Sequence, residues 1–172
     1  MAYVILGLLM LWPQSLYELT KSFEAGVSLF YSSSTGSIKR ALDRLLADDM
    51  IKVESEGGPR GKRIYAPTDT GRTEFRTWML EESHKGNPET SMLARTYFLG
   101  LLPPEERQHV VDSIRRQIQA GLAELEQVEE LVLAADVPEH FSDVARYQMA
   151  TLQYGLISHR SALTWAKKYL QG

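Results

Sequence analysis

The strongest constraint on the fold is a seven-residue apolar repeat in the second half of the chain. It follows Pro103-Pro104-Glu105-Glu106, where proline and acidic residues favour the start of a helix. Apolar residues then recur in two interleaved sets with the spacing of a heptad seam: Val111, Ile118, Leu125 and Val132 in one, Ile114, Gly121 and Val128 in the other. A long helix with such a stripe needs another helix against it, and Gly121 would admit a close neighbour.

A second seam in the last part of the chain matches the first. One set is Ala145, Leu152, His159 and Ala166, and the other is Met149, Leu156, Leu163 and Leu170. The two seams can pair within one chain as an antiparallel hairpin or across two subunits. A two-helix hairpin alone leaves apolar faces uncovered, which favours a homodimer. The residues expected to hold that dimer are Val111, Ile114, Ile118, Gly121, Leu125, Val128, Val132, Met149, Leu152, Leu156 and Leu163.

The first half of the chain begins with helices that carry clear start signals. Ser15-Leu16-Tyr17-Glu18 has the form of a capping box and predicts a helix that runs to about Phe23. A cluster of hydroxyl residues at 32–35 predicts a second start. Ile38, Leu42 and Leu45 then share one face of a helix that ends near Asp49.

A short β-hairpin is predicted next. Ile51 to Glu54 alternates apolar and polar residues, Glu56-Gly57-Gly58-Pro59-Arg60-Gly61 is a turn by composition, and 63–66 returns as the second strand. Thr68 can cap a further helix that runs to about Glu82. This order of elements predicts a winged helix-turn-helix, in which the second helix of the pair enters the DNA major groove and the hairpin is the wing.

The predicted fold is therefore mainly α with a small β-hairpin wing (α+β). A cluster of structure-breaking residues at 85–88 separates two expected domains. Residues 1–85 form a winged helix-turn-helix DNA-binding domain. Residues 86–172 form a helical dimerisation domain with long coiled-coil-like helices.

Composition excludes several classes of protein. The chain has no cysteine, which excludes disulfides, thiol catalysis and Cys-ligated metals. The first apolar run, Tyr3 to Trp12, is shorter than the roughly 20 residues of a membrane span. It also lacks the features of a secretory signal. A soluble, cytoplasmic protein is expected.

An enzyme is not expected either. The four histidines are scattered, and neither an H-E-x-x-H nor a G-x-S-x-G motif is present. The glycine-rich stretch at 57–63 lacks the spacing of a phosphate-binding loop, and Arg63 stands where that loop needs Ser or Thr. No cofactor and no metal are expected.

The sequence resembles the PadR family of bacterial transcriptional regulators, including its larger members with an AphA-like C-terminal domain. The resemblance runs over nearly the whole chain in matching order. It is carried by Ile5-Leu6-Gly7-Leu8-Leu9, Tyr17-Glu18-Leu19, Gly36-Ser37-Ile38 with Ala41-Leu42 and Arg44-Leu45, Tyr65 with Thr68 and Gly71, and the stretch from Phe98 to Glu106. The resemblance implies a homodimer on a partly palindromic operator, often as a repressor and in some members released by a small aromatic or phenolic molecule.

The chain departs from the family pattern at positions that bear on DNA. Lys39-Arg40 replaces the family's Tyr-Pro, Thr35 stands where the family has an aromatic residue, and Pro67 replaces a leucine. If the family residues at the first two places touch DNA, both affinity and sequence preference should differ in this chain.

Candidate DNA contacts lie on the second helix of the pair and on the wing. Ser37 and Arg40 are best placed to reach bases, since arginine can grip guanine bidentately. Phosphate contacts are assigned to Ser33, Ser34, Thr35 and Lys39, and Gly36 would let backbone N–H groups approach a phosphate. The full candidate set is Ser33, Ser34, Thr35, Gly36, Ser37, Lys39, Arg40, Arg44, Arg60, Lys62 and Arg63.

Two further hypotheses accompany this interpretation. The alternative function is a winged-helix protein–protein interaction module without DNA readout, which the balanced charge of residues 1–85 allows; retention on heparin or DNA at low salt would discriminate. A small aromatic effector could bind in a cavity near the dimer interface, although aromatic residues at helical spacing are more often core. The candidate lining residues are Trp78, Tyr97, Phe98, Tyr147, Tyr154 and Trp165.

Overall fold

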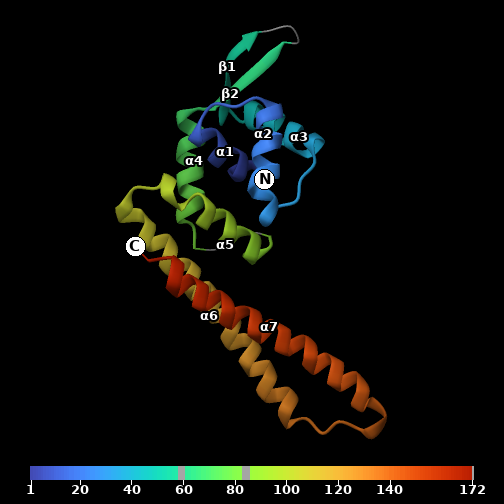
Figure 1. The fold of residues 1–172 in the computed structure, drawn as a ribbon. Coiled ribbons are helices and arrows are strands. Elements are labelled where there is room, and N and C mark those ends of the chain that lie inside the picture. Colours follow the sequence, from blue (N-terminus) through green and yellow to red (C-terminus); the bar gives the residue numbers. More distant parts are fainter. Residues whose placement is uncertain (58–60, 83–85, 172) are drawn as a thin grey trace. The chain divides into compact units, whose positions relative to one another are not determined.

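A computed structural model describes residues 1–57, 61–82 and 86–171 of the chain. It divides into two compact units, Met1–Arg107 and Gln108–Gly172 (Figure 1). In the described residues the first unit contains α1 (Ala2–Leu11), α2 (Leu16–Ala25), the 3-10 turn η1 (Val27–Leu29), α3 (Thr35–Ala47), β1 (Ile51–Gly57), β2 (Lys62–Pro67), α4 (Asp69–Leu80), α5 (Pro88–Tyr97) and η2 (Leu99–Leu101). The long helix α6 (Pro104–Ala134) begins in this unit and continues into the second, which also contains η3 (Glu139–Phe141) and α7 (Ser142–Tyr169).

Helix α1 is the centre of the first unit. Its residues from Val4 to Leu9 are all buried, as is expected of a helix that is apolar all round. It packs against α3, α4 and β2. Gly7 faces the ring of Phe98, and an added Cβ at Gly7 would lie 2.8 Å from that ring.

The predicted helix starts of the helix-turn-helix are confirmed. Ser15 caps α2 in a complete capping box, in which the Glu18 N–H donates to Ser15 Oγ and Ser15 N–H donates back to the Glu18 carboxylate. Ser34 caps α3 by accepting from the N–H of Ser37. Helix α2 runs two residues past the predicted Phe23, to Ala25.

The wing is an antiparallel pair of strands that projects beyond the helices (Figure 1). Its strands are longer than the four residues predicted for each, and the register shifts between Val53 and Ser55. The connection between α1 and α2 adds to the wing, because Gln14 pairs with Tyr65 through two backbone hydrogen bonds of 2.8 and 3.1 Å. The predicted turn residues Gly58, Pro59 and Arg60 lie outside the described residues.

Thr68 joins the wing to helix α4. Its hydroxyl accepts from the N–H of Gly71 and donates to the carbonyl of Asp49 at 2.6 Å. Asp49 has a φ of 53°, a left-handed conformation that Asp tolerates better than most residues. The start of α4 thereby lies against the turn that follows α3, and the predicted cap at Thr68 is confirmed.

The second unit is an antiparallel pair formed by α6 and α7 (Figure 1). Gly121 lies against His159, and Gly155 lies against Leu125. Arg160 pairs with Glu126 at 3.1 Å. The seams thus meet within one chain, which is the first of the two arrangements that the sequence left open.

Gly71 offers a test of this packing. A Cβ at position 71 would collide with the backbone carbonyl oxygen of Met50, which cannot move without shifting the turn after α3. We expect Gly71→Ala to lower the free energy of unfolding by about 3 kcal/mol, at the upper end of overpacking penalties. Urea denaturation followed by circular dichroism measures this.

The matched control is Gly100→Ala, because an added Cβ there meets no atom within 4 Å. We expect its stability to stay within about 0.5 kcal/mol of the wild type. Equal stability of the two variants would contradict the close contact between Gly71 and Met50.

Candidate nucleic-acid interface

Helix α3 presents two distinct faces, as predicted. Ile38, Leu42 and Leu45 are buried, each at most 2% exposed. The opposite side carries Gly36, Arg40 and Arg44, which are exposed, and Ser37, which is half-buried; the exposed Lys39 lies on its flank. The apolar face holds the helix on the first unit, so the polar face is open to solvent.

The start of α3 carries a small hydroxyl–guanidinium network. Arg40 Nη2 donates to Ser37 Oγ at 3.1 Å, and the hydroxyls of Ser34 and Ser37 lie 3.0 Å apart. Ser37 is half-buried and Arg40 is exposed. The network therefore holds the Arg40 guanidinium near the N-terminal end of the helix.

The cations of α3 are not neutralised. Over the ranges 1–57, 61–82 and 86–171, no carboxylate forms an ion pair with Lys39, Arg40 or Arg44. An added Cβ at Gly36 would meet nothing closer than 3.8 Å, so the fold itself does not require glycine there. This end of α3 is therefore a positively charged surface that is accessible from solvent.

Ser33 differs from the expectation. Its hydroxyl is buried without a hydrogen-bond partner, and it lines a small cavity of about 310 Å³ bounded by residues of α2 and α3. A side chain turned inward in this way is unsuited to a phosphate contact, because the phosphate would reach the protein from solvent.

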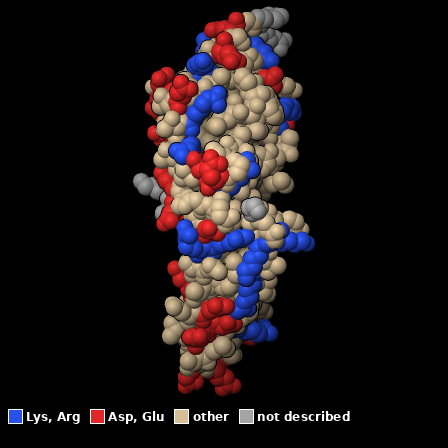
Figure 2. Space-filling view, turned by 90° about the vertical axis from the view of Figure 1, so that its left-hand side faces the viewer, with Lys and Arg blue, Asp and Glu red and all other residues tan. Residues whose placement is uncertain are grey.

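The wing cations are placed differently from those of α3. Lys62 Nζ lies 3.0 Å from Glu18 Oε1, and Arg63 Nε lies 3.0 Å from Glu56 Oε1. Basic and acidic side chains accordingly lie beside each other around the wing (Figure 2). Arg60 lies outside the described residues.

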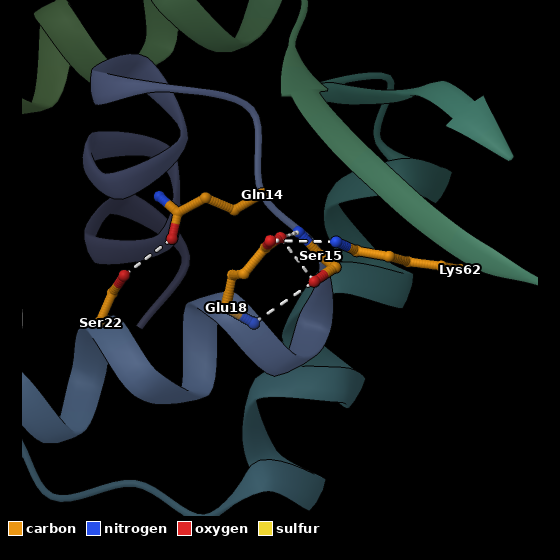
Figure 3. A network of polar contacts seen from close by, with 5 residues as sticks. All are labelled: Gln14, Ser15, Glu18, Ser22 and Lys62. Atoms are coloured by element: carbon orange, nitrogen blue, oxygen red, sulfur yellow. Dashed lines mark hydrogen bonds and ion pairs between the residues drawn. The ribbon is translucent and has the colours of Figure 1, made fainter. Parts of the chain in front are cut away.

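Glu18 is held by more than its pairing with Lys62 (Figure 3). Its Oε2 accepts from the Ser15 hydroxyl at 2.7 Å and from the Ser15 N–H at 2.8 Å. These hydrogen bonds, followed by the one from Lys62, lower the pKa of the Glu18 carboxyl to about 2. The sequence revealed the capping box, but not its link to Lys62, which is 44 residues away.

An open groove is lined by residues of α2, α3 and the wing. It has a volume of about 1070 Å³ and lies between α2, the start of α3 and the wing. Side chains of Lys21, Thr35, Lys62, Arg63 and Tyr65 line it. The groove therefore brings the first residue of α3 together with Lys62 and Arg63 of the wing.

The predicted dimer residues are partly covered within the chain. Val111, Ile114, Ile118 and Leu156 are buried, and Gly121 and Leu125 contact α7. Met149, Leu152 and Leu163 are half-buried, while Val128 and Val132 are exposed. Large apolar side chains are more exposed elsewhere on α7, at Tyr147, Tyr154 and Ile157.

The six predicted effector residues do not line one pocket in the described part of the chain. Trp78, Tyr97 and Phe98 belong to the first unit, where Trp78 stacks on Tyr3 and Phe98 packs edge-on against Tyr97. Tyr147, Tyr154 and Trp165 belong to the second unit. Of the six, Trp78 lines a cavity of about 820 Å³ in the first unit.

Comparisons with known proteins agree with this architecture. Residues 90–172 match the family described as virulence activator alpha C-term. The negative transcriptional regulator PadR of Bacillus subtilis is 26% identical over 98% of this chain and 94% of its own length. The chain is thus similar to PadR over nearly its whole length and, in residues 90–172, to the C-terminal region of virulence activators.

The chain is also similar to several solved structures. The B. subtilis PadR complex with operator DNA has 25% identity, covers 98% of this chain and 95% of that chain, and gives a TM-score of 0.45. The same protein with p-coumaric acid covers 98% and 92%, with 24% identity and a TM-score of 0.42. The Vibrio cholerae virulence activator AphA has 19% identity, 98% and 95% coverage and a TM-score of 0.44. The relationship itself rests on the full-length sequence match.

These relatives are transcriptional regulators, in agreement with the expectation that the chain is not an enzyme. In the parts of the chain that the structure describes, no group of three or more potential metal ligands comes together. None of the described helices is long and apolar enough to cross a membrane.

Proposed function

We propose that this protein is a sequence-specific DNA-binding transcriptional regulator that reads the major groove with α3. The observation that carries the proposal is the exposed N-terminal end of α3, where Ser37 and Arg40 are linked and where Lys39, Arg40 and Arg44 pair with no carboxylate of the described residues. The full-length relative is a negative regulator that has been crystallised on operator DNA, and it supports repression as the mode of action.

The contacts divide by chemistry. Ser37 and Arg40 read bases, and the surrounding residues Ser34, Thr35, Gly36, Lys39 and Arg44 hold phosphates or flank them. Lys62 and Arg63, with Arg60 from the turn, are the wing's phosphate or minor-groove contacts. In this proposal residues 1–85 bind DNA and residues 86–172 dimerise, even though α5 packs within the first compact unit.

Arg40→Ala tests the base contact. We expect it to weaken binding to the preferred sequence about 10–100-fold, since one bidentate guanine contact contributes about 1–3 kcal/mol of discrimination. Binding to unrelated DNA should weaken much less. The operator is first selected from random duplexes by the wild type, and fluorescence anisotropy then measures both affinities.

Two control variants accompany this test. Lys62→Ala should weaken binding to the selected operator and flatten its salt dependence by about one unit. Arg72→Ala, which removes an exposed cation from α4, should leave both nearly unchanged. Equal operator affinity of wild type and Arg40→Ala would overturn the base contact. Failure of the wild type to bind any DNA at low salt would favour the protein–protein module.

We also propose that the protein acts as a homodimer on a partly palindromic operator. Symmetric dimers match paired half-sites, which a single recognition helix does not. The observation that supports dimerisation is the exposed apolar side of α7, where Tyr147 is 66%, Tyr154 75% and Ile157 60% exposed. Because the seams already meet within the chain, we assign this side of α7 as the surface that a second copy covers.

The double variant Tyr154→Glu, Ile157→Glu tests the dimer. We expect the wild type to sediment as a dimer at micromolar concentration and the variant as a monomer, because two buried and unpaired carboxylates are strongly unfavourable. Leu29→Glu is the control, since Leu29 is 84% exposed in the first unit. A dimeric double variant, or a monomeric wild type, would contradict the proposal.

A small aromatic acid is proposed as the effector. The cavity of about 820 Å³ in the first unit is lined by Tyr3, Tyr31 and Trp78, and by Ser91, whose buried hydroxyl has no hydrogen-bond partner among the described residues. Aromatic rings and an unsatisfied hydroxyl suit a planar phenolic ligand. The B. subtilis relative has been crystallised with p-coumaric acid.

p-Coumarate is the probe for this site. We expect it to raise the melting temperature in proportion to the logarithm of its concentration and to release DNA. Ser91→Leu should abolish the stabilisation by filling the cavity, whereas Thr73→Leu, at an exposed position of α4, should not. Stabilisation that is unchanged in Ser91→Leu would place the ligand elsewhere.

A further inference from the structure

The two sets of proposed DNA-binding cations differ in the unbound protein. Those of α3 have no carboxylate partner among the described residues, whereas Lys62 and Arg63 on the wing each have one. Arg63 pairs with Glu56 on the adjacent strand of the same hairpin. Lys62 pairs instead with Glu18 on α2, so this ion pair links the wing to the helix-turn-helix.

The Glu18 carboxylate is fixed independently of Lys62. One oxygen, Oε2, accepts both hydrogen bonds from Ser15, and the other, Oε1, faces Lys62 Nζ (Figure 3). The carboxylate therefore occupies the N-terminal end of α2, a position where helices commonly bind phosphate. It presents an oxygen to Lys62 much as a phosphate would.

Lys62 can also readily exchange Glu18 for another anionic partner. The Lys62 side chain is 54% exposed and that of Glu18 43% exposed, and Lys62 lines the open groove beside the start of α3. Ion pairs at such a surface contribute little to stability. A phosphate that enters the groove can therefore replace Glu18 as the partner of Lys62 while the capping box stays intact.

We propose that Glu18 is a positioning residue that competes with DNA phosphate for Lys62, and thereby limits binding of the wing to DNA of unrelated sequence. The inference rests on the proposed function. In the unbound protein Glu18 neutralises Lys62, and the cations of α3 supply the attraction to DNA. Lys62 exchanges Glu18 for phosphate once α3 has docked, so non-specific complexes gain least from the wing.

Glu18→Gln tests this exchange. The glutamine side chain keeps an oxygen that can accept from Ser15, but it no longer carries the charge that holds Lys62. We expect the affinity for a labelled mixed-sequence duplex to rise about 3–10-fold at low salt, with the salt slope steeper by about 0.9, the value of one additional phosphate contact. The affinity for the selected operator should rise less, so the specificity ratio falls.

A double-mutant cycle with Lys62→Ala separates this mechanism from a general loss of negative charge. In the Lys62→Ala background, Glu18→Gln should change neither the affinity nor the salt slope. Glu54→Gln is the matched control, since Glu54 is exposed on β1 and makes no ion pair with the described residues. It should leave the salt slope unchanged. Thermal denaturation of each variant verifies that it is folded.

Two outcomes would overturn the inference while leaving the proposed function in place. One is a Glu18→Gln variant that binds the mixed-sequence duplex no more tightly than the wild type. The other is an equal gain in the presence and absence of Lys62. A wild type that binds neither duplex would instead overturn the proposed function, and this inference with it.

Discussion

The short connection between α1 and α2 fixes the wing to the helices, and it does so through the buried residue Gln14. Its backbone pairs with Tyr65 of β2, and its side-chain amide donates to the Leu8 carbonyl at 2.8 Å. Its side-chain oxygen accepts from the Ser22 hydroxyl at 2.8 Å (Figure 3). Both ends of the amide are thus satisfied inside the protein. A buried polar group left without a partner costs about 1–3 kcal/mol, so this geometry is strongly preferred over any that breaks it.

The same connection also positions the carboxylate that pairs with the wing. Ser15 follows Gln14 directly and holds Glu18, which in turn holds Lys62. This short segment therefore has two effects on the wing. The hydrogen bonds of Gln14 fix the position of the wing, and Ser15 holds the carboxylate that neutralises Lys62. The overall charge of −3 conceals this local arrangement, in which Lys39, Arg40 and Arg44 on α3 have no carboxylate partner among the described residues, whereas Lys62 and Arg63 on the wing each have one.

The second unit shows how one heptad pattern serves a hairpin. Gly121 and Gly155 lie on facing helices, and each accommodates a larger side chain of the other helix, His159 and Leu125 respectively. His159 Nδ1 lies 2.9 Å from the Gly155 carbonyl oxygen, which satisfies the imidazole within its own helix. Each of these two glycines is thereby matched to a larger side chain, and the exposed apolar surface of α7 is left on another side of the helix.

The sequence by itself determined the helix starts at Ser15, Ser34 and Thr68, the buried face of α3 and the existence of the wing, because caps and apolar periodicity are local. It did not determine whether the two heptad seams pair within one chain or between two chains, since a helix of either origin can cover such an apolar stripe equally well. Nor did it reveal the inward turn of Ser33, the Gln14–Tyr65 pairing or the Glu18–Lys62 pair. These join residues far apart in the chain or depend on the packing of a side chain, so only the tertiary structure decided them.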